Sequence, residues 1–106
     1  MATTQDYIHF IAEQLSDLDD ISIRSMMGEY IVYYRGKIAA YVCDNRFLVK
    51  PVASAIAMLP DAPFQPPYEG AKDMLLVEDI DNRELLRMLF EKMYDELPAP
   101  KPKKKK

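Results

Sequence analysis

Apolar residues recur at helical spacing near the start of the chain, on one broad face between residues 7 and 18. Thr3 is followed three positions later by Asp6, which is the acidic variant of the capping box found at helix starts. The pattern therefore predicts a first helix over residues 4–18. Because the helix dipole disfavours acidic side chains at the C-terminus, we expect solvation or a basic partner for the aspartates that end it, Asp17, Asp19 and Asp20.

The period of the pattern then changes from helical to alternating. Alternation over residues 21–24 predicts a short strand that Gly28 ends. Two runs rich in β-branched and aromatic residues follow, over residues 30–34 and 37–43, and the dipeptide Arg35-Gly36 separates them. Such runs around a two-residue turn predict a β-hairpin.

The alternation continues beyond this hairpin. Asp44-Asn45 is a second tight-turn signal, and residues 46–50 alternate again until Pro51, which has no amide to donate to a ladder. We therefore expect the hairpin to extend into an antiparallel meander. An alanine-rich segment over residues 52–59 predicts a short helix, and the prolines between residues 60 and 70 predict a stiff irregular loop.

The last part of the chain predicts one more strand and a closing helix. Residues 74–78 read as the strand, and Asp81 with Glu84 repeats the capping pattern before an amphipathic stretch. The order of elements predicts an α+β domain over residues 1–97, in which an N-terminal helix, a short central helix and a C-terminal helix pack on one face of an antiparallel meander sheet. Residues 98–106 are rich in lysine and proline, and we expect a disordered tail.

The charge is distributed unevenly along the 106 residues. The first 97 residues hold nine basic and seventeen acidic side chains, so that this part carries about −8. Such a body lacks the positive footprint of a typical nucleic-acid-binding domain. The tail would attract nucleic acid through charge alone, in a contact that is weak and sensitive to salt, and its lysines are Lys101, Lys103, Lys104, Lys105 and Lys106.

The residue types that usually carry catalysis or bind cofactors are scarce. One cysteine, Cys43, and one histidine, His9, exclude an internal disulfide and a multi-histidine or Cys/His metal site. The three glycines form no phosphate-binding loop. Residues 1–6 contain neither the basic nor the apolar stretch of a secretory signal, and no apolar run approaches the roughly 18 residues of a membrane span. We therefore expect a cytoplasmic protein that is not an enzyme, with no cofactor, no metal and no membrane contact.

Four tyrosines on the predicted strands suggest a platform for single-stranded nucleic acid, namely Tyr30, Tyr33, Tyr34 and Tyr41. Basic residues lie between or beside them, at Arg35, Lys37, Arg46 and Lys50. We favour an ordinary strand role, because Tyr30 and Tyr34 fall on one face of their strand and Tyr33 on the other. A further hypothesis is a small-molecule cleft under the proline loop, lined by Phe64 and Tyr68. The edges of a short sheet also allow a homodimer.

Residues 24–50 resemble the signature of the N-terminal domain of the TfoX/Sxy family. That signature has an Arg-x-Met-Phe-Gly-like element before a strand, a turn with Gly-Lys, and a strand that ends in lysine. Met27 stands where the family usually has phenylalanine, which exchanges one large apolar group for another. The matching residues are Arg24, Met26, Met27 and Gly28 in the first element, Gly36 and Lys37 in the turn, and Lys50 at the strand end.

The resemblance implies an α+β domain found in regulators of natural competence, which act with a cyclic-AMP receptor protein at particular promoters. It implies no defined catalytic site. We therefore expect a regulatory or adaptor domain that acts by binding an unknown protein, with the transcription machinery as the candidate partner. We also expect Arg24 and Lys50 to approach one another beside Gly28. The alternative function is direct, weak nucleic-acid binding through the lysine tail and the basic strand residues.

Overall fold

The computed structural model describes residues 3–26 and 28–97. Its sheet has six strands, and every pair of neighbouring strands is antiparallel. In order across the sheet these are β1 (Ile21–Met26), β2 (Glu29–Tyr34), β3 (Lys37–Cys43), β4 (Arg46–Val49), β6 (Met74–Leu76) and β5 (Phe64–Gln65). The helices are α1 (Gln5–Gln14), α2 (Ala53–Met58) and α3 (Arg83–Met93), and α3 continues into the 3₁₀ turn η1 (Tyr94–Glu96).

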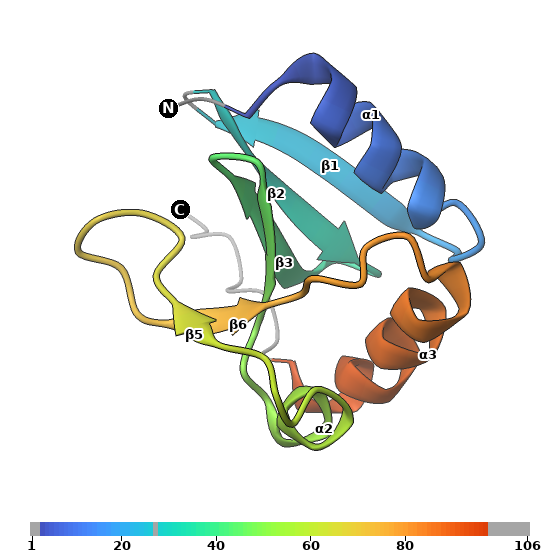
Figure 1. Cartoon of the computed structure of the whole chain (residues 1–106). Coiled ribbons are helices and arrows are strands. Elements are labelled where there is room, and N and C mark those ends of the chain that lie inside the picture. The colour runs from blue at the N-terminus through green and yellow to red at the C-terminus, as the bar shows by residue number, and fades with distance from the viewer. Residues whose placement is uncertain (1–2, 27, 98–106) are drawn as a thin grey trace, which may run out of the picture.

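This arrangement confirms the predicted fold class (Figure 1). β1 to β4 form the predicted meander, and β6 joins it beside β4. α1 and α3 lie on the same side of the sheet, and α2 packs beside α3. We call the side covered by these helices the helix face, and the opposite side the open face. The predicted tail over residues 98–106 lies outside the described residues and stays a prediction.

Both predicted hairpin turns adopt a left-handed backbone at each central residue. The φ angles are 52° and 85° at Arg35 and Gly36, and 54° and 56° at Asp44 and Asn45. Two consecutive positive φ values define the type I′ turn, whose twist matches that of the flanking strands. The second turn sets the register of β3 with β4, and the first sets that of β2 with β3 as far as Tyr33 and Ile38.

Two features of the sheet depart from the sequence pattern. Val32 pairs with Ala40 whereas Tyr33 pairs with Ile38, so Ala39 is the extra residue of a β-bulge. The proline loop also contains the two-residue strand β5, which pairs with β6 at the end of the sheet. The sequence predicted an irregular loop there because proline has no amide to donate to a neighbouring strand.

The start and end of the first helix differ from the prediction. The cap is Thr4 and not Thr3, because the Thr4 hydroxyl oxygen accepts the amide of Tyr7 at 3.2 Å. α1 ends at Gln14, and residues 15–20 form turns in place of the helix predicted to residue 18. Asp17 has the expected basic partner, since Arg83 Nη2 lies 3.2 Å from Asp17 Oδ1.

The closing helix begins one residue later than the capping pattern suggested. Asn82, and not Asp81, is the cap, and its side-chain oxygen accepts the amide of Leu85 at 3.1 Å. Both residues are typical helix caps, so the pattern alone did not separate them. α3 ends at Met93, and the last turn of the predicted closing helix is the tighter 3₁₀ turn η1.

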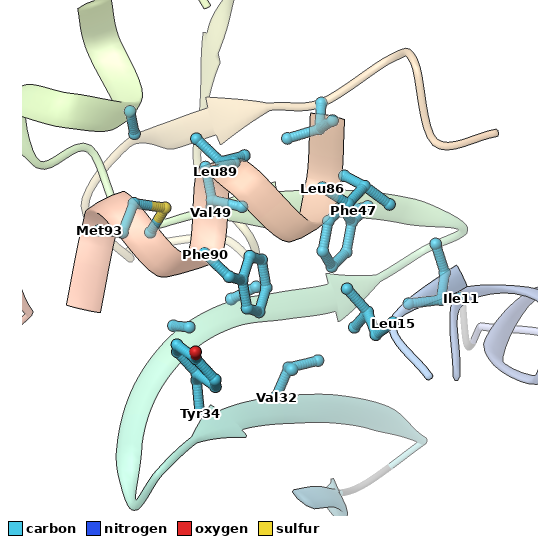
Figure 2. Packing of buried hydrophobic residues seen from close by; sticks show 14 of the residues in the cluster. Ile11, Leu15, Val32, Tyr34, Phe47, Val49, Leu86, Leu89, Phe90 and Met93 are labelled. Atoms are coloured by element: carbon cyan, nitrogen blue, oxygen red, sulfur yellow. The ribbon is translucent and has the colours of Figure 1, made fainter. Parts of the chain in front are cut away.

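The main core lies between the helix face and the two long helices (Figure 2). Val32 and Tyr34 from β2 and Phe47 from β4 meet Phe90 of α3, and the rings of Phe47 and Phe90 stack at 6.1 Å between centroids. Ile11 of α1 completes this layer with no exposed surface. Within the described residues, none of the helices has both the length and the apolar composition needed to cross a membrane.

Candidate functional site

The open face divides into a covered half and an uncovered half. Over β4 and β6, Leu48 and Met74 are buried in a small cluster with Cys43. Over β1 and β2, Arg24 is exposed, and Tyr33 is partly exposed. The cover on the first half is the loop over residues 66–73, which leaves the sheet on its open side (Figure 1).

Arg46 of β4 fastens this loop to the sheet. Its guanidinium donates to the side-chain oxygen of Gln65 at 2.9 Å and to the carbonyls of Pro66 and Pro67, each at 3.1 Å. Farther along the loop, the amide of Ala71 donates to the carbonyl of Tyr68 at 3.1 Å. Together these bonds hold the irregular segment in one position. Arginine suits this role because its planar guanidinium carries five N–H donors.

A pocket of about 230 Å³ lies between the loop and the sheet. Tyr41 and Tyr68 form part of its wall, with ring centroids 6.5 Å apart and planes inclined at 58°. Burial raises the pKa of Tyr41, and the nearby Tyr68 and Tyr33 hydroxyls raise it further. The cleft hypothesis is therefore right about Tyr68 and wrong about Phe64, which pairs with Leu75 and does not line the pocket.

The turn residues of the family signature have structural roles. Lys37 donates to the carbonyl of Tyr94 at 3.0 Å and lies 4.1 Å from the centre of that ring, so it holds η1 against the sheet. Gly36 has φ of 85° and open space around its Cα, so its requirement is conformational rather than steric. Gly28, with φ of 87°, turns β1 into β2.

Arg24 and Lys50 do not meet. They lie on β1 and at the end of β4, and two strands separate these elements. Lys50 also follows the end of β4 that is farthest from the turn at Gly28, so the expected approach beside this glycine is wrong. Arg24 and Met26 are exposed on the open face, and Met27 lies outside the described residues.

Thr3 has a role that the sequence pattern missed. It is buried, its amide donates to the carbonyl of Gly28 at 3.2 Å, and its hydroxyl donates to Glu29 at 2.9 Å. The same hydroxyl oxygen accepts the amide of Asn45 at 3.3 Å, and Glu29 also accepts the amide of Asp44 at 2.9 Å. Thr3 therefore ties the β1–β2 turn to the β3–β4 turn, over sequence separations that no local motif reveals.

β1 is the long edge strand of the sheet. Within the described chain it pairs with β2 alone, whereas β5 at the other edge has two residues. Arg35 N donates to Asp20 O at 2.9 Å, and hydrogen-bonded pairs alternate along an antiparallel ladder. The backbone groups of Ile21, Ile23 and Ser25 therefore point away from β2, toward solvent.

A groove of about 400 Å³ lies beside this edge, and both polar side chains, Ser16 and Asp20, and apolar ones line it. Leu15 and Leu18 contribute from the end of α1 and the turn after it, and Ile21 and Ile23 contribute from β1. The groove lies on the helix-face side of the edge, because Ile23 pairs with the buried Val32. A free strand edge next to such a groove can bind an extended peptide through both backbone and side chains.

Cys43 and His9 are far from forming a catalytic pair. Cys43 is 1% exposed in the cluster on the open face, and burial raises the pKa of its thiol to about 11. His9 is exposed on α1, which covers the opposite face. Among the described residues, no group of three or more His, Cys, Asp or Glu side chains is placed to hold a metal ion.

The basic strand residues expected to contact nucleic acid are mostly engaged within the fold. Lys37 and Arg46 make the bonds described above, and the Arg35 guanidinium lies 5.3 Å from the ring centre of Tyr34. The structure therefore does not bring these cations together as one surface. The tail lysines lie outside the described residues, namely Lys101, Lys103, Lys104, Lys105 and Lys106.

Comparison with known families agrees with this architecture. The profile of the TfoX N-terminal domain matches residues 13–95, and the chain belongs to this family. The chain is also 33% identical over 107 residues to the "Uncharacterized 12.7 kDa protein in trpE 5'region" of Spirochaeta aurantia, an alignment that covers 100% of this chain and 93% of that protein. No solved structure matches the chain.

Proposed function

We propose that this chain is a non-enzymatic cytoplasmic adaptor that regulates by binding an extended segment of a protein partner along β1. The observation that carries the proposal is the six-residue open edge of β1 beside the groove of about 400 Å³. Strand addition at such an edge gains affinity from main-chain hydrogen bonds and specificity from pockets for alternate side chains. The groove would take every second side chain of the added strand.

Membership of the TfoX N-terminal domain family supports the regulatory part of the proposal. The family resemblance implies regulators of natural competence that act with a cyclic-AMP receptor protein. The cyclic-AMP receptor protein and RNA polymerase are therefore the first partners to test. The non-enzymatic part is supported by Cys43, because a thiol with a pKa of about 11 is protonated at neutral pH.

A proline at Ser25 tests the proposal. Ser25 is exposed and its amide points outward, so Ser25→Pro removes one docking donor and leaves the β1–β2 ladder intact. Ser25→Ala keeps the amide and is the matched control. A two-hybrid assay would pair the wild type and both variants with the cyclic-AMP receptor protein and with RNA polymerase subunits. We expect an interaction that Ser25→Pro abolishes and Ser25→Ala keeps.

The same two variants test whether the partner is a second copy. Light scattering during gel filtration would then show a dimer for the wild type and for Ser25→Ala, and a monomer for Ser25→Pro, because two β1 edges would pair. Equal behaviour of both variants with every partner, or turnover of a substrate by the purified protein, would contradict the proposal.

A second candidate is binding of single-stranded nucleic acid on the open face. It is favoured by the aromatic row of Tyr33, Tyr41 and Tyr68, with Arg24 and Lys50 on the same face. Base stacking on aromatic side chains needs such a row. Fluorescence anisotropy of labelled single-stranded DNA, with the intact chain and a version ending at Leu97, would show salt-resistant binding by both if this face is used. The charge of about −8 on residues 1–97 places this candidate second.

A further inference from the structure

The pocket beneath the loop over residues 66–73 has the shape of a site for a small flat molecule. Its volume of about 230 Å³ is below the roughly 300–1,000 Å³ typical of pockets for drug-sized ligands. Tyr41 and Tyr68 provide inclined aromatic walls, and Pro51 and Pro67 add apolar surface. A ligand with a single ring fits this space.

The pocket is held open by contacts that involve none of its own polar side chains. The three bonds from Arg46 fix the loop at residues 65–67, and Pro67 itself is buried. The bond from Ala71 N to Tyr68 O closes the far turn. Since these walls are fixed in advance, a ligand would not have to pay the entropy of ordering the loop.

The charges of the pocket point to a ligand with one negative charge. Two lysines, Lys50 and Lys72, and one aspartate, Asp73, line it, which leaves an excess of one positive charge. Within the described residues, four basic side chains make no hydrogen bond, ion pair or ring contact, and two of the four line this pocket. These four are Arg24, Lys50, Lys72 and Lys92.

We propose that this pocket binds a small aromatic monocarboxylate, whose ring packs against the wall formed by Tyr41 and Tyr68 and whose carboxylate meets Lys50 and Lys72. Asp73 disfavours a dianion such as a phosphate monoester, because like charges in one site repel. The proposal is independent of the β1 edge, which belongs to another side of the domain.

Benzoate is the test probe, added to the full chain labelled with ¹⁵N and followed by amide chemical shifts. We expect saturable shifts with a Kd in the millimolar range, confined to residues around Ala71, Lys72 and Met74. Benzyl alcohol keeps the ring without the charge, and acetate keeps the charge without the ring. Both should bind at least about tenfold more weakly, since each lacks one half of the recognition.

Three charge-removing variants locate the site. Lys50→Gln and Lys72→Gln should each weaken benzoate binding about tenfold, whereas Lys92→Gln on α3 removes the same charge elsewhere and should leave it unchanged. The amide spectrum itself shows whether each variant is folded. Shifts spread over the surface, equal effects of all three variants, or tighter binding of adenosine monophosphate than of benzoate would overturn the proposal. Ser25→Pro should leave benzoate binding unchanged, so this test stands apart from that of the adaptor function.

Discussion

Tyr33 and Tyr34 are neighbours on β2, and the sheet sends them to opposite faces. Tyr34 is 3% exposed and packs against Phe90 and Tyr94, with ring centroids 5.9 Å and 5.6 Å away. Tyr33 is partly exposed on the open face, near the Tyr41 hydroxyl. The same residue type therefore stabilises the fold on one face and remains accessible on the other, and only the strand period decides which.

The open face is not uniform, and its two halves differ for a reason unrelated to strand period. Leu48 and Ile31 share this face on nearby strands, yet Leu48 has no exposed surface and Ile31 is half-buried. The difference comes from the loop that Arg46 fastens over β4 and β6. The loop that Arg46 holds in place thus buries one half of this face, as α1 and α3 bury the centre of the opposite face.

The largest effect on stability should come from replacing Tyr34 and Tyr33, each in its own variant, by threonine. Threonine keeps a high β propensity, so Tyr34→Thr and Tyr33→Thr differ mainly in what they remove. We expect Tyr34→Thr to lower the free energy of unfolding by about 3 kcal/mol, because it leaves a cavity beside Phe90, and Tyr33→Thr by less than about 1 kcal/mol. Urea denaturation of both variants measures this. Equal losses would mean that the two faces do not differ in packing.

Cys43 tests whether the covered half of the open face is closed to solvent. With a pKa of about 11, only about one thousandth of the thiol is ionised at pH 8, so its reaction with a disulfide reagent should be at least about a hundredfold slower than that of an exposed thiol. The reaction should reach the rate of a free cysteine in denaturant. Rapid stoichiometric labelling of the folded protein would show that the cluster with Leu48 and Met74 opens readily.

Removing the three hydrogen bonds from Arg46 to the loop should expose the covered half of the open face to solvent. Arg46→Met keeps the apolar stem and deletes the three bonds to residues 65–67, and we expect a loss of about 2 kcal/mol. Arg87→Met, which breaks an exposed pair with Glu91 at 3.7 Å, is the matched control and should cost less than about 0.5 kcal/mol. Urea denaturation gives both losses, and limited proteolysis should cut the loop over residues 66–73 only in Arg46→Met.

The sequence predicted much of the fold because its decisive signals are local. Alternation and two turn dipeptides are enough to predict the order of the strands in the meander and their antiparallel pairing. β5 and the bulge at Ala39 escaped prediction because neither has a local signal. The helix caps were each assigned one residue too early, since Thr3 and Asp81 are as good a cap by type as Thr4 and Asn82.

The candidate sites were less predictable, because they depend on contacts between distant segments. The pairing of Tyr41 with Tyr68 and the clamp by Arg46 cross about twenty residues or more of sequence. Lys37 was singled out as a signature residue, but its partner Tyr94 lies 57 positions away. The signature residues thus lie at the β-turns and at the contact between Lys37 and η1. They do not identify the groove along β1, because that groove forms only where the end of α1 lies beside the edge strand.

The smallest effect on stability should come from the contact between η1 and the start of α2. Glu96 accepts the amide of Ser54 at 2.8 Å and its hydroxyl at 2.7 Å, and the backbone bond, followed by the side-chain bond, lowers the pKa of Glu96. A carboxyl whose pKa is lower in the folded state stabilises the fold above its unfolded pKa, and this contribution is lost as the pH falls through the folded pKa. The wild type should therefore exceed Glu96→Gln in urea midpoint at pH 7, with a gap that closes progressively below about pH 4.5. Asp95→Asn changes the adjacent exposed carboxyl and leaves both bonds to Ser54 in place, so it is the matched control for Glu96→Gln. A gap that widens in acid would contradict the assigned role of Glu96.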